Sequence, residues 1–82
     1  MNTRFVITYI NQNGQRQLKG TNQSRFHSLT KSEAEQKLDA FINSNTLKDI
    51  VLYYGKNSIG TFKVQEAECY PTGDLKSIYF NQ

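Results

Sequence analysis

The sequence is poor in the residues that build catalytic centres and covalent crosslinks. Its 82 residues include one cysteine, one histidine, one proline and no tryptophan. Because the single cysteine, Cys69, has no partner within the chain, an intramolecular disulfide is excluded and the fold has to be held by its core. A lone cysteine without neighbouring ligand-type residues is typical of a reducing compartment, so we expect a cytoplasmic protein.

Long hydrophobic runs are also missing. The longest, Ile50 to Tyr54, is far shorter than the roughly 18 residues that cross a bilayer, and the first residues contain no apolar stretch of signal-peptide length. We therefore expect neither a membrane protein nor an exported one. A chain of 82 residues has room for one hydrophobic core, which predicts a single domain over residues 1–82.

The few titratable side chains that catalysis needs do not form a recognisable site. His27 and Cys69 would have to meet in space to make a thiolate–imidazolium pair, and nothing near them in the sequence favours that over a solvated histidine and a buried cysteine. Glu66 and Glu68 share a strand face, as paired carboxylates do, but acids there also protect a sheet edge from aggregation. We predict that the chain is not an enzyme and that it holds no metal or cofactor.

Negative charge is absent from the first third of the chain. All seven acids follow residue 32, so residues 1–32 carry a charge of +5 and residues 33–82 a charge of −2. The cations of the acid-free segment are candidates for binding nucleic acid or an acidic partner, and they are Arg4, Arg16, Lys19, Arg25 and Lys31. The alternative is a solvated surface whose cations pair with acids of the following helix.

Residues 4–11 are almost all β-branched or aromatic, which predicts a strand. Asn13-Gly14 follows, the strongest short signal for a two-residue hairpin turn, and a second strand is expected over residues 15–19. This turn would pair Tyr9 with Leu18. The predicted core face then consists of Phe5, Ile7, Tyr9 and Leu18, while Val6, Thr8, Ile10, Gln17 and Lys19 form the other face.

A helix is predicted to begin at Lys31. Thr30 and Glu33 are spaced as a capping box, in which each side chain satisfies a backbone N–H group near the helix start. The apolar residues that follow recur at helical spacing and form one stripe of Ala34, Leu38, Phe41 and Ile42. The sequence Asn43-Ser44-Asn45 is expected to end this helix, whose stripe would cover one face of the sheet.

The region after this helix is predicted to consist of strands. Residues 47–54 fit both a helical stripe closed by Gly55 and a strand, and we favour the strand. A long strand is expected over residues 61–70. Because its apolar residues change phase along the strand, we predict a β-bulge near Gln65 and Glu66.

The remaining residues complete the predicted fold. Pro71-Thr72-Gly73-Asp74 is typical of a turn, and a last strand is expected over 75–80. The elements then follow in the order ββαβββ. We predict an α+β domain in which a small antiparallel sheet of four to five strands has one amphipathic helix packed on one face.

With a single helix, one face of such a sheet stays open. That face, bearing Val6 and Ile10, is suited to self-association or to a protein partner, and an exposed edge strand can accept a strand from another chain. The leading hypothesis is a small non-enzymatic binding or adaptor module that acts through protein contacts, using the open face and the basic hairpin against an acidic surface. The alternative is a nucleic-acid-binding protein that uses the acid-free hairpin and loop.

Overall fold

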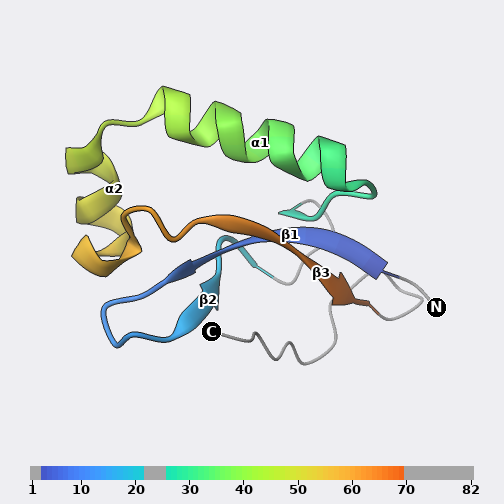
Figure 1. The fold of residues 1–82 in the computed structure, drawn as a ribbon, viewed down its shortest axis with the longest axis horizontal. Coiled ribbons are helices and arrows are strands. Elements are labelled where there is room, and N and C mark those ends of the chain that lie inside the picture. Colours follow the sequence, from blue (N-terminus) through green and yellow to red (C-terminus); the bar gives the residue numbers. More distant parts are fainter. Residues whose placement is uncertain (1–2, 22–25, 70–82) are drawn as a thin grey trace.

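The computed structural model describes residues 3–21 and 26–69. Its sheet has three antiparallel strands in the order β2-β1-β3, so the N-terminal strand is central. These strands are β1 (Thr3–Ile10), β2 (Arg16–Leu18) and β3 (Lys63–Glu68). Figure 1 shows β1 and β3 crossing the molecule below the helices, with the shorter β2 beside β1.

Between β2 and β3, the described residues include two α-helices and a short 3-10 helix. They are α1 (Lys31–Ser44), α2 (Leu47–Tyr54) and η2 (Lys56–Ser58). In Figure 1, α1 runs along one face of the sheet and α2 turns down from its end toward the loop that enters β3. The predicted α+β fold is confirmed. Four to five strands and the order ββαβββ are not, because the described part of the chain has three strands and two α-helices. The turn and strand predicted over residues 71–80 lie outside the described residues.

The β1–β2 hairpin differs from its prediction by one residue. Leu18 pairs with Thr8 instead of Tyr9. Since neighbouring residues of a strand point to opposite faces, this shift exchanges the faces predicted for Leu18 and Lys19. Leu18 packs on the face opposite the helices, and Lys19 lies on the helix-covered face.

The side chain of Asn11 accounts for the shift. Its Oδ1 atom accepts the backbone N–H groups of Asn13 at 2.9 Å and Gln15 at 3.0 Å, which encloses a three-residue loop. Gly14 has a φ of 77°, and no residue other than glycine has positive φ among those described. Asn13 therefore does not adopt the two-residue type I′ turn that Asn-Gly favours, which needs positive φ at both positions.

α1 begins and ends where the sequence predicts. Thr30 Oγ1 accepts the N–H of Glu33 at 3.1 Å, and Asn45 caps the other end by donating from Nδ2 to the carbonyl of Phe41 at 2.8 Å. The carboxylate of Glu33 lies 3.8 Å from Lys37 Nζ. One half of the predicted capping box is thus present, while the Glu33 side chain pairs along the helix instead.

Residues 47–54 form a helix, so the strand predicted there is wrong. Thr46 and Asp49 make a complete capping box, in which Asp49 N donates to Thr46 Oγ1 at 3.2 Å and Thr46 N donates to Asp49 Oδ2 at 3.4 Å. Gly55 ends the helix with a φ of 92° and donates its N–H to the carbonyl of Val51 at 3.0 Å. These start and stop signals outweigh the strand-like composition between them.

β3 pairs with β1 in an unbroken register, so the predicted β-bulge is wrong. The bulge was expected on the assumption that one face of the sheet is covered. Both faces of β1 instead hold buried residues, because Val6 is 1% exposed on one face and Tyr9 is 8% exposed on the other. A regular strand therefore turns Val64 toward the helices and Ala67 toward the opposite side without any loss of burial.

The sheet face opposite the helices is closed at its centre. Val6, Ala67 and Cys69 form a buried cluster with Leu18 packed against it, and Thr8 is fully buried. The expectation that Val6 lies on an open surface is therefore wrong. An exposed apolar surface has to be sought elsewhere on the molecule.

Four aromatic rings join the sheet to both helices. Tyr9 comes from β1, Phe41 from α1 and Tyr54 from α2, and Phe62 immediately precedes β3. The centroids of contacting rings lie 5.0 to 5.5 Å apart. Since aromatic pairs contribute about 0.5–1.5 kcal/mol each beyond the burial of their area, this cluster fixes the position of α2.

Candidate functional site

α2 exposes most of its apolar side chains. Six of its eight residues are aliphatic or aromatic, yet of these Ile50 alone is buried. Leu47, Leu52 and Tyr53 are 68%, 71% and 74% exposed, and Val51 is 40% exposed. A helix that is apolar on all sides is normally covered on all sides, and exposed apolar patches mark interaction sites.

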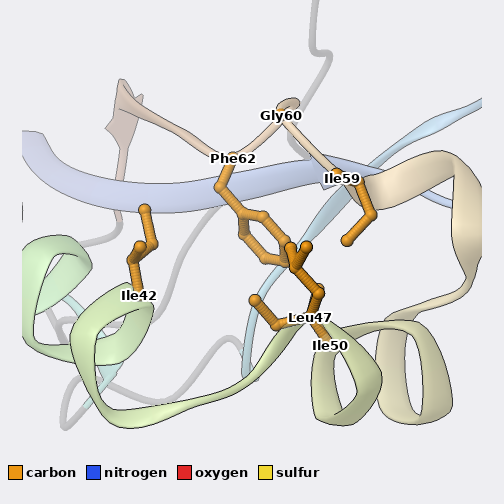
Figure 2. Close-up of a pocket in the computed structure, with 6 residues that line it drawn as sticks. All are labelled: Ile42, Leu47, Ile50, Ile59, Gly60 and Phe62. Atoms are coloured by element: carbon orange, nitrogen blue, oxygen red, sulfur yellow. The ribbon is translucent and has the colours of Figure 1, made fainter.

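An apolar groove adjoins these residues. It lies between α2, the end of α1 and the loop that enters β3, has a volume of about 310 Å³, and is lined by Ile42, Leu47, Ile50, Ile59, Gly60 and Phe62. Figure 2 shows side chains converging from both helices and the loop, with the Phe62 ring at the centre. Ile42 and Ile59 are themselves exposed, so the groove opens to solvent. We refer to the groove and the exposed apolar residues of α2 together as the α2 surface.

Hydrogen bonds hold the loop that forms one wall of the groove. Ser58 Oγ donates to the carbonyl of Gly55 at 2.6 Å, and Thr61 Oγ1 donates to the carbonyl of Ser58 at 2.6 Å. Thr61 Oγ1 also accepts the N–H of Ile10 at 2.9 Å. These bonds tie η2 to the end of β1, so Ile59 is presented by a loop that is fixed at both ends.

Arg16 connects β2 to the same loop. Its Nη1 atom donates to Thr8 Oγ1 at 3.1 Å and to the carbonyl of Thr61 at 3.0 Å, while Thr8 Oγ1 donates to Gln65 Oε1 at 2.6 Å. The guanidinium is therefore engaged within the molecule. It supports the loop beside the groove rather than projecting into solvent.

A second hollow, of about 360 Å³, also borders α2. It is lined by Gln12, Val51, Lys56 and Asn57, and Asn57 Nδ2 donates to the carbonyl of Gln12 at 3.2 Å. Among its described lining residues, Lys56 is the one that carries a charge. We refer to this second hollow as the polar hollow.

The charges around α2 are unbalanced. Lys48 and Lys56 are exposed, and neither forms an ion pair with any residue in the described ranges, where the ion pairs lie within α1. The acid of α2, Asp49, accepts the N–H of Thr46 in the capping box. The rim of the α2 surface therefore has a positive character that suits an anionic group.

The cations singled out in the sequence have different surroundings. Arg4 donates from Nη1 to the carbonyl of its neighbour Thr3 at 2.8 Å on the sheet face opposite the helices. Lys31 lies 3.9 Å from the carboxylate of Glu35 in an exposed pair one helical turn apart, an arrangement that contributes little to stability. Arg25 lies outside the described residues.

Lys19 lies over an aromatic ring on the helix-covered face. Its Nζ atom is 4.5 Å from the centroid of the Phe41 ring, and burial lowers the pKa of this lysine. A cation over a ring contributes about 0.5–1 kcal/mol at a partly exposed site. Lys19 and Arg16 are thus both engaged in contacts between elements, and the role of all five cations in binding stays a prediction.

The four residues considered for catalysis lie in two different environments. His27 and Cys69 are both buried, and Glu66 and Glu68 are exposed along β3. Within residues 3–21 and 26–69, no group of three or more histidine, cysteine or acidic side chains is positioned to hold a metal ion.

Comparison with family models, with curated proteins and with solved structures finds no match to this chain. In the part that the structure describes, no helix has the length and apolar character needed to cross a membrane.

Sequence reasoning missed the α2 surface because it took residues 47–54 for a strand. Two local signals in the sequence indicate the helix. Thr46 stands three residues before Asp49, a spacing typical of a capping box, and Gly55 is typical of a helix end. In a helix, residues 47–54 would have more apolar side chains than a single buried stripe can hold, and this predicts an exposed apolar surface.

Proposed function

We propose that this chain is a small non-enzymatic binding module that acts through protein contacts, and that the α2 surface is its docking surface. The observation that carries the proposal is the exposure of Leu47, Leu52 and Tyr53, each about 70%, on a helix of eight residues. Covering such side chains would release on the order of 1.5–3 kcal/mol for each one fully buried. Because association costs roughly 4–15 kcal/mol in lost freedom of motion, these three side chains supply part of the free energy of binding, and contacts in the groove have to supply the rest.

The α2 surface is not the contact surface that the sequence predicts, which consists of the open sheet face and the basic hairpin. Val6 lies in the buried centre of its sheet face, and Arg16 of the basic hairpin is hydrogen-bonded within the molecule. The α2 surface takes their place, because it is apolar, exposed and supported by a fixed loop. A groove flanked by a short helix is a common way for a protein to receive the apolar side chains of another.

The test compares copurifying proteins for the wild type and two matched variants. Leu52→Glu/Tyr53→Glu places charge on the α2 surface, and Ser32→Glu/Gln36→Glu places the same charge on exposed positions of α1. From a lysate of the source organism at low salt, we expect the α2 variant to retain at least tenfold less of the specific partners and the α1 variant to retain them. Equal retention by all three proteins contradicts the proposal, and so does the absence of any retained protein. Circular dichroism melts verify that both variants are folded.

A further inference from the structure

We propose that the α2 surface binds an acidic amphipathic segment of a partner protein, with a bulky apolar side chain in the groove and a carboxylate beside Lys56. The inference rests on the proposed function and specifies the chemistry of the partner. It follows from the two hollows that border α2 and from the charges on its rim.

The groove suits one or two apolar side chains. Its volume of about 310 Å³ is at the lower end of the roughly 300–1,000 Å³ typical of sites for small molecules. Its lining is hydrocarbon, and a Cβ atom added at Gly60 would meet nothing within 4 Å. A groove of this size and lining accommodates a leucine or phenylalanine side chain beside Phe62.

The polar hollow borders the same helix as the groove. Ile50 lines the groove and the next residue, Val51, lines the polar hollow. Because consecutive side chains point about 100° apart around a helix, a bound segment has to pass around α2 to reach both. Lys56 supplies a positive charge there, and no acid is among the described lining residues. A carboxylate next to the apolar anchor would form a charge-assisted hydrogen bond with the Lys56 ammonium.

Charge also distinguishes this partner from a second copy of the chain. Two copies facing each other through α2 would bring together Lys48, Lys56 and Asp49 from both, so each copy would contribute an excess of one positive charge. Each copy carries a net charge of +3, so like charges oppose self-association. An acidic segment from another protein has the opposite effect, because it neutralises the rim.

The test uses three acetylated and amidated tetrapeptides as probes, titrated into the ¹⁵N-labelled full chain and followed by amide chemical shifts. The probes are Glu-Leu-Phe-Glu, Lys-Leu-Phe-Lys and Glu-Ser-Ser-Glu. We expect the first to shift the amides of Ile50, Gly60 and Phe62, the second to bind at least fivefold more weakly, and the third to leave these amides unchanged. In Lys48→Glu/Lys56→Glu, whose substituted positions are exposed, we expect the order of the first two probes to reverse.

Several results overturn the inference. In the titrations, these are equal affinity for the acidic and basic probes, an unchanged order of affinity in Lys48→Glu/Lys56→Glu, and the absence of amide shifts at the groove with any probe. In sedimentation equilibrium, it is a dimer that becomes a monomer in Leu52→Glu/Tyr53→Glu. If the probes fail while Leu52→Glu/Tyr53→Glu still removes specific partners, the proposed function stands and this inference fails. If the probes bind while partners are retained by that variant, the proposed function fails.

Discussion

The rings of Tyr9 and Tyr54 meet edge to face, with centroids 5.0 Å apart and planes at 78°. Tyr9 belongs to the central strand and Tyr54 to the last turn of α2, so the contact joins the helix that carries the α2 surface to the middle of the sheet. Because one side of α2 is anchored in this way, its other side can expose apolar residues without the helix leaving its place.

We expect Tyr54→Ala to lower the free energy of unfolding by about 2–4 kcal/mol, as truncation of a packed aromatic residue does. The adjacent Tyr53 provides the control, because it is 74% exposed and its truncation should change stability by no more than about 0.5 kcal/mol. Urea denaturation followed by circular dichroism measures both. Similar losses for the two variants would show that the aromatic cluster does not anchor α2.

The pKa values of Tyr9 and Tyr54 predict how the stability of the fold depends on alkaline pH. Burial raises the pKa of Tyr9, and burial together with the charge of Tyr9 raises the pKa of Tyr54. The unfolded chain therefore loses these phenol protons at lower pH than the folded one. The stabilisation from the neutral phenols is fully present below the ordinary tyrosine value of 10.0 and is lost as the pH rises through the folded-state pKa values.

Chemical denaturation at pH 8 to 11 tests this dependence. We expect the free energy of unfolding of the wild type to fall above about pH 10, and the fall to be smaller in Tyr9→Phe/Tyr54→Phe. Tyr53→Phe is the control, and its pH dependence should match that of the wild type. If the double variant loses stability over this range as steeply as the wild type, the two phenols do not carry the effect.

Some elements of this fold are predictable because their signals are local. α1 begins after Thr30 as its cap indicates, and residues 4–11 show the composition of a strand. The hairpin register is not predictable from Asn13-Gly14 alone, because the Asn11 side chain accepts two backbone N–H groups and enlarges the loop. Such a bond between a side chain and the backbone competes with the turn preference of the dipeptide.

Other elements depend on contacts distant in the sequence. The β-bulge was predicted from the phases of Val64 and Ala67, and it is not needed because both faces of β1 are buried. Burial on the second face is a tertiary property that alternation within one strand does not reveal. The groove likewise combines α1, α2 and the loop before β3, so its residues cannot be grouped before the fold is known.

Gly55 ends α2 and lies against the side chain of Gln12 in the hairpin loop. It has a φ of 92°, and a Cβ atom added there would collide with the side chain of Gln12. Gly14 has a comparable φ of 77° and open space around it, so Gly14→Ala isolates the cost of the left-handed backbone, about 1–2 kcal/mol. We expect Gly55→Ala to cost more than Gly14→Ala, because Gly55 combines its positive φ with a ψ of 157°, a region that is essentially limited to glycine, and because the added Cβ collides with Gln12.

A double-mutant cycle separates the two contributions. Gln12→Ala removes the Gln12 atoms nearest to the added Cβ, so in that background Gly55→Ala should cost less than in the wild type, and the cost that remains reports the backbone strain at Gly55. Thermal denaturation of the five proteins gives these differences. An unchanged cost of Gly55→Ala in the Gln12→Ala background would mean that the collision with Gln12 is relieved without loss of stability.

The binding of oligonucleotides tests the role of the basic first third. Arg16 donates to Thr8 and Thr61, and Lys19 lies over Phe41, so at most Arg4, Arg25 and Lys31 of the five candidates are left to contact phosphates. Each phosphate contact contributes about −0.9 to the slope of log affinity against log salt. For double-stranded DNA we therefore expect a slope no steeper than about −3, with weak and sequence-independent binding.

Fluorescence polarisation of labelled single- and double-stranded oligonucleotides, at low and near-physiological salt, measures this slope. Arg4→Gln/Lys31→Gln should make it shallower by about 2 if both residues contact phosphates, and the control Lys48→Gln should leave it unchanged. A slope near −4.5, equivalent to five cations at about −0.9 each, would show that more cations contact phosphates than Arg4, Arg25 and Lys31. That result, with submicromolar affinity at physiological salt, would favour a nucleic-acid-binding protein over a protein-docking module.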